Sequence, residues 1–319
     1  QEIGVENPFS DLGSPFGGES VTGLNDILQA IKYAKTDANI KGIYLQSDAT
    51  LSGWAMLEEI RNQLIDFKKS GKFIVTYAEA YSEKGYYLAS VADKIYLNPS
   101  GDLEWNGISA EYQFFKGTFD KLGVKPEVFR VGEFKSAVEM FSRTDMSEAS
   151  KKQSTELLGA INNNFLKNVS TSRSIPQEQL KKLADSLLID NPIAALKYKL
   201  VTHLSYWDEV EKNLKKELQV EAKKDVPFIN ITKYLKGVDT NETGDINKRI
   251  AILVADGEIT SGEGDNGSIG STKFIKELRK ARQDEKVKAI VLRINSPGGS
   301  ALASDVMWRE IQLTSKEKP

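Results

Sequence analysis

Two stretches of the chain share one pattern of apolar and polar positions. Residues 24–46 and residues 271–293 both read as an amphipathic helix, a charged turn and an apolar strand. They align without a gap at a constant offset of 247 residues, which pairs Asp37 with Asp284. Each strand is followed by a loop and another helical segment. We therefore predict that the chain contains a duplicated unit.

Beyond its first copy, the pattern continues to alternate between strands and helices. Apolar runs predict strands at residues 73–78, 94–99 and 127–131, the last with the sequence "EVFRV". A longer periodic stretch predicts a helix over about residues 148–169. Strands that alternate with helices indicate an α/β fold.

The polar, turn-rich segment "VDTNETGDINKR" is the best candidate for a linker. We predict a first domain with a C-terminal helical extension at residues 1–237, a linker at 238–249 and the start of a second domain at 250–319. The second copy stops at Pro319, where the first copy continues into another strand. The first copy also lacks a counterpart of the strand "IAILVADGEI". We therefore expect both ends to be truncated relative to one repeat.

Composition excludes several kinds of site and partner. The chain has 319 residues, of which 40% are hydrophobic and 28% charged, with a net charge of −2. This balance, without a long basic run, argues against nucleic acid as a partner. The absence of cysteine and the presence of one histidine argue against a metal site and a thiolate nucleophile. No apolar run reaches the roughly 18 residues that a membrane span needs, and the start at Gln1 suggests that an upstream anchor was removed.

The stretch "VLRINSPGGSALAS" (291–304) combines an apolar strand, a glycine turn and a helix start. Gly298 and Gly299 let backbone N–H groups point into a cavity without a Cβ in the way. The N–H groups at the start of the following helix would face the same place. This arrangement can bind the oxyanion of a tetrahedral intermediate. Glycines alone are also typical of an ordinary strand–helix turn.

The stretch "VFRVGEFKSAVEMF" (128–141) places Lys135 between a predicted strand and a predicted helix. Its neighbours Phe134, Val138 and Phe141 are apolar. A lysine that accepts a proton near neutral pH must have a lowered pKa, and burial lowers it. If Lys135 is a general base, we therefore expect a largely buried amine that faces the second half of the protein. In a truncated fragment, which lacks that wall, its exposure does not decide the role. A solvated lysine at a helix start is the alternative.

These motifs together resemble a known family. "INSPGGS" after an apolar strand is similar to the ClpP/crotonase-like serine peptidases. With "FRVGEFKSAVEMFSRTDMS" (129–147) and "YSEKGYYLASVADKIYLNPSG" (81–101), the chain resembles the signal peptide peptidase A family in its long, double-domain form. "PIAALKYKLVTHLSYWDEV" (192–210) resembles the segment after the family's lysine helix. The resemblance covers essentially the whole chain.

The resemblance implies a fold of repeated β-β-α units in two tandem related domains, with the second truncated here. It implies a Ser–Lys endopeptidase that degrades cleaved signal peptides or other hydrophobic peptides without a metal or cofactor. Lys135 falls on the family's general base, and Gly298 and Gly299 fall on its oxyanion-hole loop. The family is anchored by an N-terminal segment in the bacterial inner membrane, with its catalytic part outside the cytoplasm. It assembles as a ring-like homo-oligomer, for which we favour a tetramer.

The nucleophilic serine is expected in a turn roughly a dozen residues beyond Pro319, judged from the repeat. We therefore expect this fragment to be inactive on its own. In the first copy the corresponding position, anchored on Gly85, holds Glu83. Ser82 lies one residue early, and such a shift at a helix start turns a side chain by about 100°. Ser82 is the alternative nucleophile.

Other residues have simpler interpretations. His203, the single histidine, is expected to make a local turn contact. Ser296 and Ser300 read as turn and cap residues. Glu139 and Arg143, four residues apart, would form an ordinary helix pair.

Two other classes of protein remain open. One is a non-catalytic scaffold of the same fold. The other is a crotonase-like acyl-CoA enzyme, ranked last because no basic cluster for the nucleotide phosphate is present.

Overall fold

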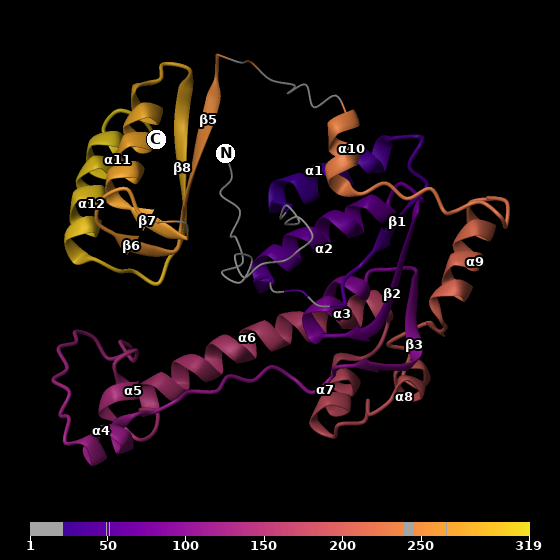
Figure 1. Cartoon of the computed structure of the whole chain (residues 1–319), viewed down its shortest axis with the longest axis horizontal. Helices are drawn as coiled ribbons and strands as arrows, with labels where there is room; N and C mark the ends of the chain where they lie inside the picture. Colours follow the sequence, from indigo (N-terminus) through magenta and orange to yellow (C-terminus); the bar gives the residue numbers. More distant parts are fainter. Residues whose placement is uncertain (1–21, 49, 51, 239–244, 246, 266) are drawn as a thin grey trace. The chain divides into compact units, whose positions relative to one another are not determined.

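The computed structural model describes residues 22–319 except residues 49, 51, 239–244, 246 and 266. The chain divides into two compact units (Figure 1). The lysine unit comprises residues 28–229, and the glycine-loop unit comprises the described residues of 230–319 together with 22–27. Most of the predicted linker 238–249 lies outside the described residues, so the predicted domain boundaries stay a prediction.

The lysine unit is built on a parallel sheet with the strand order β1-β2-β3-β4. Parallel neighbours need crossover connections, which helices supply here. This arrangement confirms the predicted α/β class. The strands are β1 (Gly42–Leu45), β2 (Phe73–Tyr81), β3 (Lys94–Leu103) and β4 (His203–Leu204), and the helices between the first three are α2 (Trp54–Lys68) and α3 (Glu83–Ala89).

One core cluster of this unit lies between the sheet and a late helix. Val75 of β2 and Tyr96 of β3 pack against Val210 and Leu214, which lie on one face of α9 (Trp207–Glu217). The four-residue spacing of the two α9 residues puts them on the same side of the helix. The remaining helices here are α1 (Leu24–Thr36), which starts just before the unit, α7 (Gln177–Asp185) and α8 (Pro192–Lys197).

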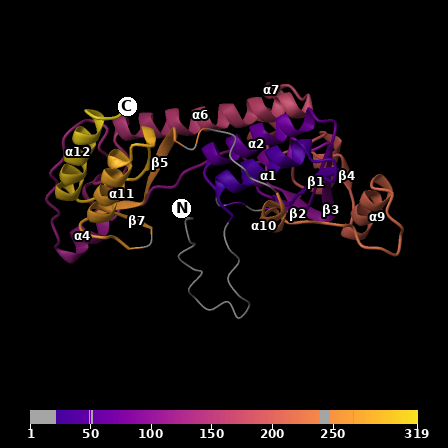
Figure 2. The same cartoon turned by 90° about the horizontal axis from the view of Figure 1, so that it is seen from above.

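An arm, defined as residues 108–147, leaves the core after β3 and contains α4 (Lys116–Leu122) and α5 (Glu139–Ser142). The long helix α6 (Glu148–Arg173) returns from the arm to the core and ends beside α7 in both views (Figures 1 and 2). It starts at Ser147, whose hydroxyl accepts a hydrogen bond from the Ser150 amide. The predicted helix over 148–169 is confirmed.

The predicted strand at residues 127–131 is wrong. The structure shows no regular element there, although the segment alternates apolar and polar residues. Phe129 and Val131 are 92% and 90% exposed. A strand is stabilised by pairing with a neighbour, and among the described residues none pairs with this segment. Lys135 therefore does not lie at a strand–helix junction.

The glycine-loop unit has two parallel strand pairs, β5 with β8 and β6 with β7. Its core joins Phe274 and Leu278 of one helix to Met307 of another, above Ala255 of the sheet. Its elements are α10 (Ile231–Gly237), β5 (Arg249–Asp256), β6 (Glu258–Thr260), β7 (Ser268–Gly270), α11 (Ser271–Gln283), β8 (Val287–Asn295) and α12 (Ala301–Ser315).

The predicted duplication is confirmed at the level of element bounds. Helices α1 and α11 start and end at positions that differ by 247 residues, and α2 and α12 do so as well. The four residues of β1 correspond to the middle of β8 at the same offset. Each copy is thus a helix, a turn, a strand and a second helix, and the two helices have the same lengths in both copies.

The turn between helix and strand also repeats its hydrogen bonds. The Asp37 carboxylate accepts the amide of Asn39 at 2.9 Å, and the Asp284 carboxylate accepts the amide of Lys286 at 2.8 Å. A lysine near the end of each second helix then closes the unit. The Lys72 ammonium donates to the carbonyls of Ala34 and Asp37, both at 2.6 Å, and the Lys318 ammonium donates to those of Ala281 and Asp284 at 3.0 and 2.5 Å. We call these contacts the lysine clamps.

Candidate functional site

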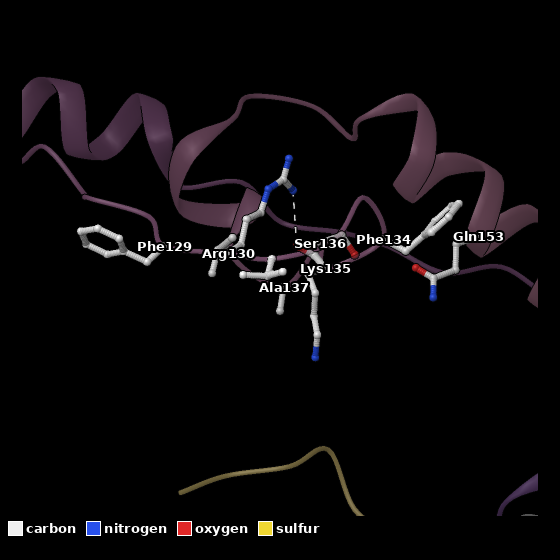
Figure 3. A pocket seen from close by; sticks show the side chains of 9 residues that line it. Phe129, Arg130, Phe134, Lys135, Ser136, Ala137 and Gln153 are labelled. Atoms are coloured by element: carbon white, nitrogen blue, oxygen red, sulfur yellow. Dashed lines mark hydrogen bonds between the residues drawn. The ribbon is translucent and has the colours of Figure 1, made fainter. Parts of the chain in front are cut away.

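Lys135 lies in an irregular stretch of the arm, shortly before α5. Gly132, with φ of +97°, provides the turn that precedes it. The side chain is exposed and points away from the labelled neighbours (Figure 3). The amine is thus exposed within the lysine unit, and its burial against the second half stays a prediction. Phe134 and Phe141, which were expected to enclose it, are themselves partly exposed.

A buried carboxylate holds the backbone around Lys135. Glu139, which is 3% exposed, accepts a hydrogen bond from Arg130 Nη1 at 3.1 Å. Its other oxygen accepts the amide of Ser147 at 3.0 Å, at the start of α6. Arg130 Nη1 also donates to the carbonyl of Lys135 at 3.3 Å (Figure 3). These bonds hold the pKa of Glu139 below its ordinary value, the Ser147 contacts first and Arg130 after them.

Sequence reasoning missed this network. It expected Glu139 to pair with Arg143, but the Arg143 guanidinium instead pairs with Asp145 at 2.9 Å. Arg130 and Glu139 are nine residues apart, which is not a helix spacing. The turn between them brings the two groups together, so spacing alone gave no signal of the pair.

A hollow of about 490 Å³ opens beside Lys135. Its wall is formed mostly by apolar side chains, together with the cations Arg130 and Lys135 and the neutral polar residues Ser136 and Gln153. An apolar hollow with a few polar groups is typical of a site that takes an organic ligand. The lining residues are Phe129, Arg130, Val131, Phe134, Lys135, Ser136, Ala137, Val138 and Gln153.

The glycine loop follows β8 and needs both glycines. Gly298 has φ of +102° and Gly299 has φ of +153°, values that side-chain-bearing residues rarely adopt. A Cβ on Gly299 would overlap the carbonyl oxygen of Ile259. The loop is held against β6 because the Ile259 amide donates to the Gly298 carbonyl, and the Ser300 amide donates to the Ile259 carbonyl, both at 2.8 Å.

The serines of this loop are turn and cap residues, as expected. Ser296 Oγ accepts the Gly298 amide at 3.1 Å. Ser300 is the N-cap of α12, and its Oγ accepts the Ala303 amide at 3.2 Å. Ser304 Oγ donates back to the Ser300 carbonyl at 2.9 Å. An oxyanion that takes the Gly298 amide must therefore displace the Ser296 hydroxyl from it.

Ser82 and Glu83 open helix α3 of the lysine unit. Ser82 is its N-cap: the hydroxyl accepts the Gly85 amide at 3.1 Å and donates to the Asp48 carbonyl at 3.2 Å. Glu83 is buried, and its Oε1 accepts the amides of Asn106 and Gly107 at 3.0 and 2.8 Å. Burial raises the pKa of Glu83 against the opposing effect of these two N–H groups.

The structure does not bring Ser82 and Lys135 together. Helix α3 packs on the far part of α6, where Tyr87 meets Phe165 with ring centroids 5.9 Å apart. The Lys135 segment instead contacts Ser147, at the other end of α6 (Figure 1). The helix rises about 27 Å between Ser147 and Phe165 at 1.5 Å per residue.

His203 makes local contacts, as expected. Its Nδ1 lies 2.8 Å from Thr202 Oγ1, and its ring stacks on Tyr96 with centroids 4.7 Å apart. Partial burial, and secondarily Lys94, lower the pKa of His203. Nothing in these contacts resembles a base that is oriented by a carboxylate.

Metal sites and membrane helices were also sought in the described part of the chain. No group of three or more His, Cys, Asp or Glu side chains there is placed to hold a metal ion. No helix there is long and apolar enough to cross a membrane.

The chain is similar to known proteins over most of its length. Serine protease SPPA, chloroplastic, of Arabidopsis thaliana is 37% identical over 293 residues, covering 90% of this chain and 43% of that protein. Protease 4 of Salmonella typhi is 38% identical, covering 90% and 47%. Protease 4 of Haemophilus influenzae is 36% identical, covering 97% and 52%. Among solved structures, a mutant of the 1510-N membrane-bound stomatin-specific protease is 14% identical with a TM-score of 0.37, covering 60% of this chain and 77% of that one.

A sequence model of Peptidase family S49 matches residues 66–221, which contain Lys135. The matched residues include the strands β2, β3 and β4 of the parallel sheet, and the three relatives all carry the name of a protease. The chain therefore contains a region of peptidase family S49, at residues 66–221. It spans about half the length of the curated relatives that it matches.

Proposed function

We propose that the protein hydrolyses peptide bonds with a serine nucleophile and a lysine base, and that Lys135 is this base. The observation that carries the proposal is the position of Lys135 at an apolar hollow within the region that matches a peptidase family. Histidine does not fill the role, because His203 is occupied with local contacts.

The chemistry asks two things of Lys135. Its amine must be neutral to accept the proton of a serine hydroxyl as that oxygen attacks the peptide carbonyl. It must then return the proton to the leaving amine when the peptide bond breaks. Lysine suits this role better than arginine, which stays charged. A bound peptide that covers the hollow would exclude water from the amine.

The oxyanion of the tetrahedral intermediate needs N–H donors, and we assign these to the loop of Gly298 and Gly299. Neither Gly298 nor Gly299 carries a Cβ, and the Ile259 amide holds the Gly298 carbonyl in place by a hydrogen bond. Fixed donors stabilise a developing negative charge without reorganising at the moment of reaction. The N–H groups at the start of α12 add a partial positive charge at the same loop.

The proposed substrates are cleaved signal peptides or other hydrophobic peptides. The exposed Phe129, Val131 and Phe134 at the hollow support an apolar peptide over a charged one. We further propose that the protein acts at the bacterial cell envelope as a membrane-anchored, ring-like homo-oligomer, with a tetramer favoured. The Protease 4 relatives are bacterial, which supports this location, although the Arabidopsis relative is named chloroplastic.

The test is hydrolysis of a hydrophobic fluorogenic peptide by the complete protein that contains this chain. Lys135→Ala and Lys135→Arg should each lower kcat/KM by about 10²- to 10⁴-fold, the usual contribution of general acid–base catalysis. Lys125→Ala changes another exposed lysine of the arm and should leave the rate unchanged. A Lys135→Ala protein that keeps most of its activity would exclude this base. Binding of a CoA thioester to the wild type would favour the acyl-CoA alternative.

A further inference from the structure

Glu83 is an unusual residue to find buried at the start of α3. It is 8% exposed, and no cation pairs with it among the residues that the structure describes. Burying an unpaired carboxylate is costly unless hydrogen bonds compensate. Here the compensation comes from backbone N–H groups alone: Oε1 takes both the Asn106 and the Gly107 amide.

These two amides mark the root of the arm. Just before them, the Glu104 amide donates to the Tyr81 carbonyl at 2.9 Å, and the buried Trp105 indole donates to the Leu180 carbonyl at 3.0 Å. Just after them, the chain runs without regular structure to α4. Gly107, with φ of +88°, turns the backbone at this point. Among the described residues, the bonds to Glu83 are thus the last hydrogen bonds that tie the chain to the core before it runs on to Tyr112.

A series of contacts continues from this root to Lys135. The Tyr112 hydroxyl lies 2.9 Å from Ser154 Oγ of α6. This contact fixes the irregular segment that runs from the root to α4. The Phe115 amide then donates to the Met140 carbonyl of α5 at 2.7 Å. Residue Glu139 of the same helix turn bonds Arg130, which bonds the Lys135 carbonyl. These contacts are the route by which a shift at the root would reach the lysine.

We propose that Glu83, which occupies the position predicted for the nucleophile in the first repeat, acts as a positioning residue for Lys135. Its carboxylate holds two backbone amides in the way an oxyanion would, and so fixes where the arm starts. The inference rests on the proposed function, since it assigns Glu83 to the placement of the general base.

Three variants separate this role from a general loss of stability. Glu83→Ala removes the acceptor and leaves the amides of Asn106 and Gly107 unpaired. Glu83→Gln keeps a carbonyl oxygen that can accept both amides while removing the charge. Glu104→Gln removes a neighbouring exposed charge and serves as the matched control.

The first measurement is hydrogen–deuterium exchange on this chain, which needs no peptidase activity. In Glu83→Ala, exchange at Asn106 and Gly107 should rise at least about tenfold, because their hydrogen bonds are lost. Exchange over residues 129–138 should also rise, while β2 and β3 stay protected. Glu83→Gln and Glu104→Gln should match the wild type. Unchanged exchange at residues 129–138 in Glu83→Ala would overturn the proposal.

The second measurement is the pH dependence of kcat/KM of the complete protein. One side of the profile of kcat/KM against pH reports deprotonation of the lysine base. Its position should shift in Glu83→Ala and be that of the wild type in Glu83→Gln, because only the first variant displaces the amine. If exchange changes but this side of the profile stays in place, Glu83 has a structural role alone and the proposal fails. The proposed function is tested apart from this, by the loss of activity in Lys135→Ala.

Discussion

Arg130 Nη1 and Glu139 Oε1 lie 3.1 Å apart, and the same Arg130 nitrogen reaches the carbonyl oxygen of Lys135 at 3.3 Å. The pair therefore shapes the backbone of the proposed base without touching its amine. Since Glu139 also accepts the Ser147 amide, one buried carboxylate joins the lysine segment to the start of α6.

Glu139→Ala should destabilise the protein by about 1–3 kcal/mol, because it removes a buried acceptor that bonds the Arg130 guanidinium and the part-buried Ser147 amide. Urea denaturation, followed by circular dichroism, measures the change. Asp145→Ala is the control: this exposed carboxylate pairs with Arg143, and the loss of such a pair costs below about 1 kcal/mol. Equal losses in the two variants would contradict the role given to Glu139.

The contribution of Glu139 should depend on pH in a defined direction. Its pKa is held below the ordinary value of 4.5, so the folded state favours the charged form. The resulting stability is fully present above the ordinary pKa and is lost as the pH falls through the folded-state pKa. The gap in unfolding free energy between wild type and Glu139→Gln should therefore be constant near neutral pH and shrink below about pH 4.5. A difference in unfolding free energy that widens on acidification would contradict the lowered pKa of Glu139.

The two loop glycines should differ in their response to substitution. Gly298→Ala places a Cβ in open space, so it should lower the free energy of unfolding only through the strain of the positive φ, by about 1–2 kcal/mol. Gly299→Ala should cost more, because its Cβ overlaps the backbone of Ile259 and forces the loop away from β6. Amide exchange at Ile259 and Ser300 reports that separation. Fast exchange in Gly298→Ala with protection retained in Gly299→Ala would refute this account.

The lysine clamps should contribute similarly in the two repeats. Lys72→Met and Lys318→Met keep most of the aliphatic stem and remove the ammonium that binds two carbonyls. Each should destabilise its own unit by about 1–3 kcal/mol, the range for hydrogen bonds to charged groups. Amide exchange measured separately in the two units is the readout. Lys41→Met is the control, since its exposed ammonium reaches one carbonyl, that of Ala38, and little change is expected.

Local patterns predicted the repeated units well. The helical periodicity of α1 and α11 is contained within each segment, and the polar turns after them, at Asp37 and Asp284, use side-chain bonds to amides two residues later. Such features depend on neighbours in sequence. The bounds of the helices in one copy could therefore be predicted from its own sequence and compared with those of the other copy.

Features that depend on distant partners could not be predicted in this way. Phe129 and Val131 alternate with polar residues as a strand would, but alternation does not supply a neighbouring strand. Apolar residues beside Lys135 in sequence likewise did not bury it, because burial depends on what packs over them. The partner of Glu139 turned out to be Arg130 instead of Arg143, since the chain turns between them.

The duplicated unit gives this protein an internal reference. Ala34 and Ala281 hold equivalent places, as do Asp37 and Asp284, yet Ala34 is buried and Ala281 is only half-buried. Any difference between the two members of such a pair, in exchange rate or in tolerance of substitution, reports the environment of each copy, because local geometry is shared. One molecule thus carries both halves of a comparison that otherwise needs two proteins.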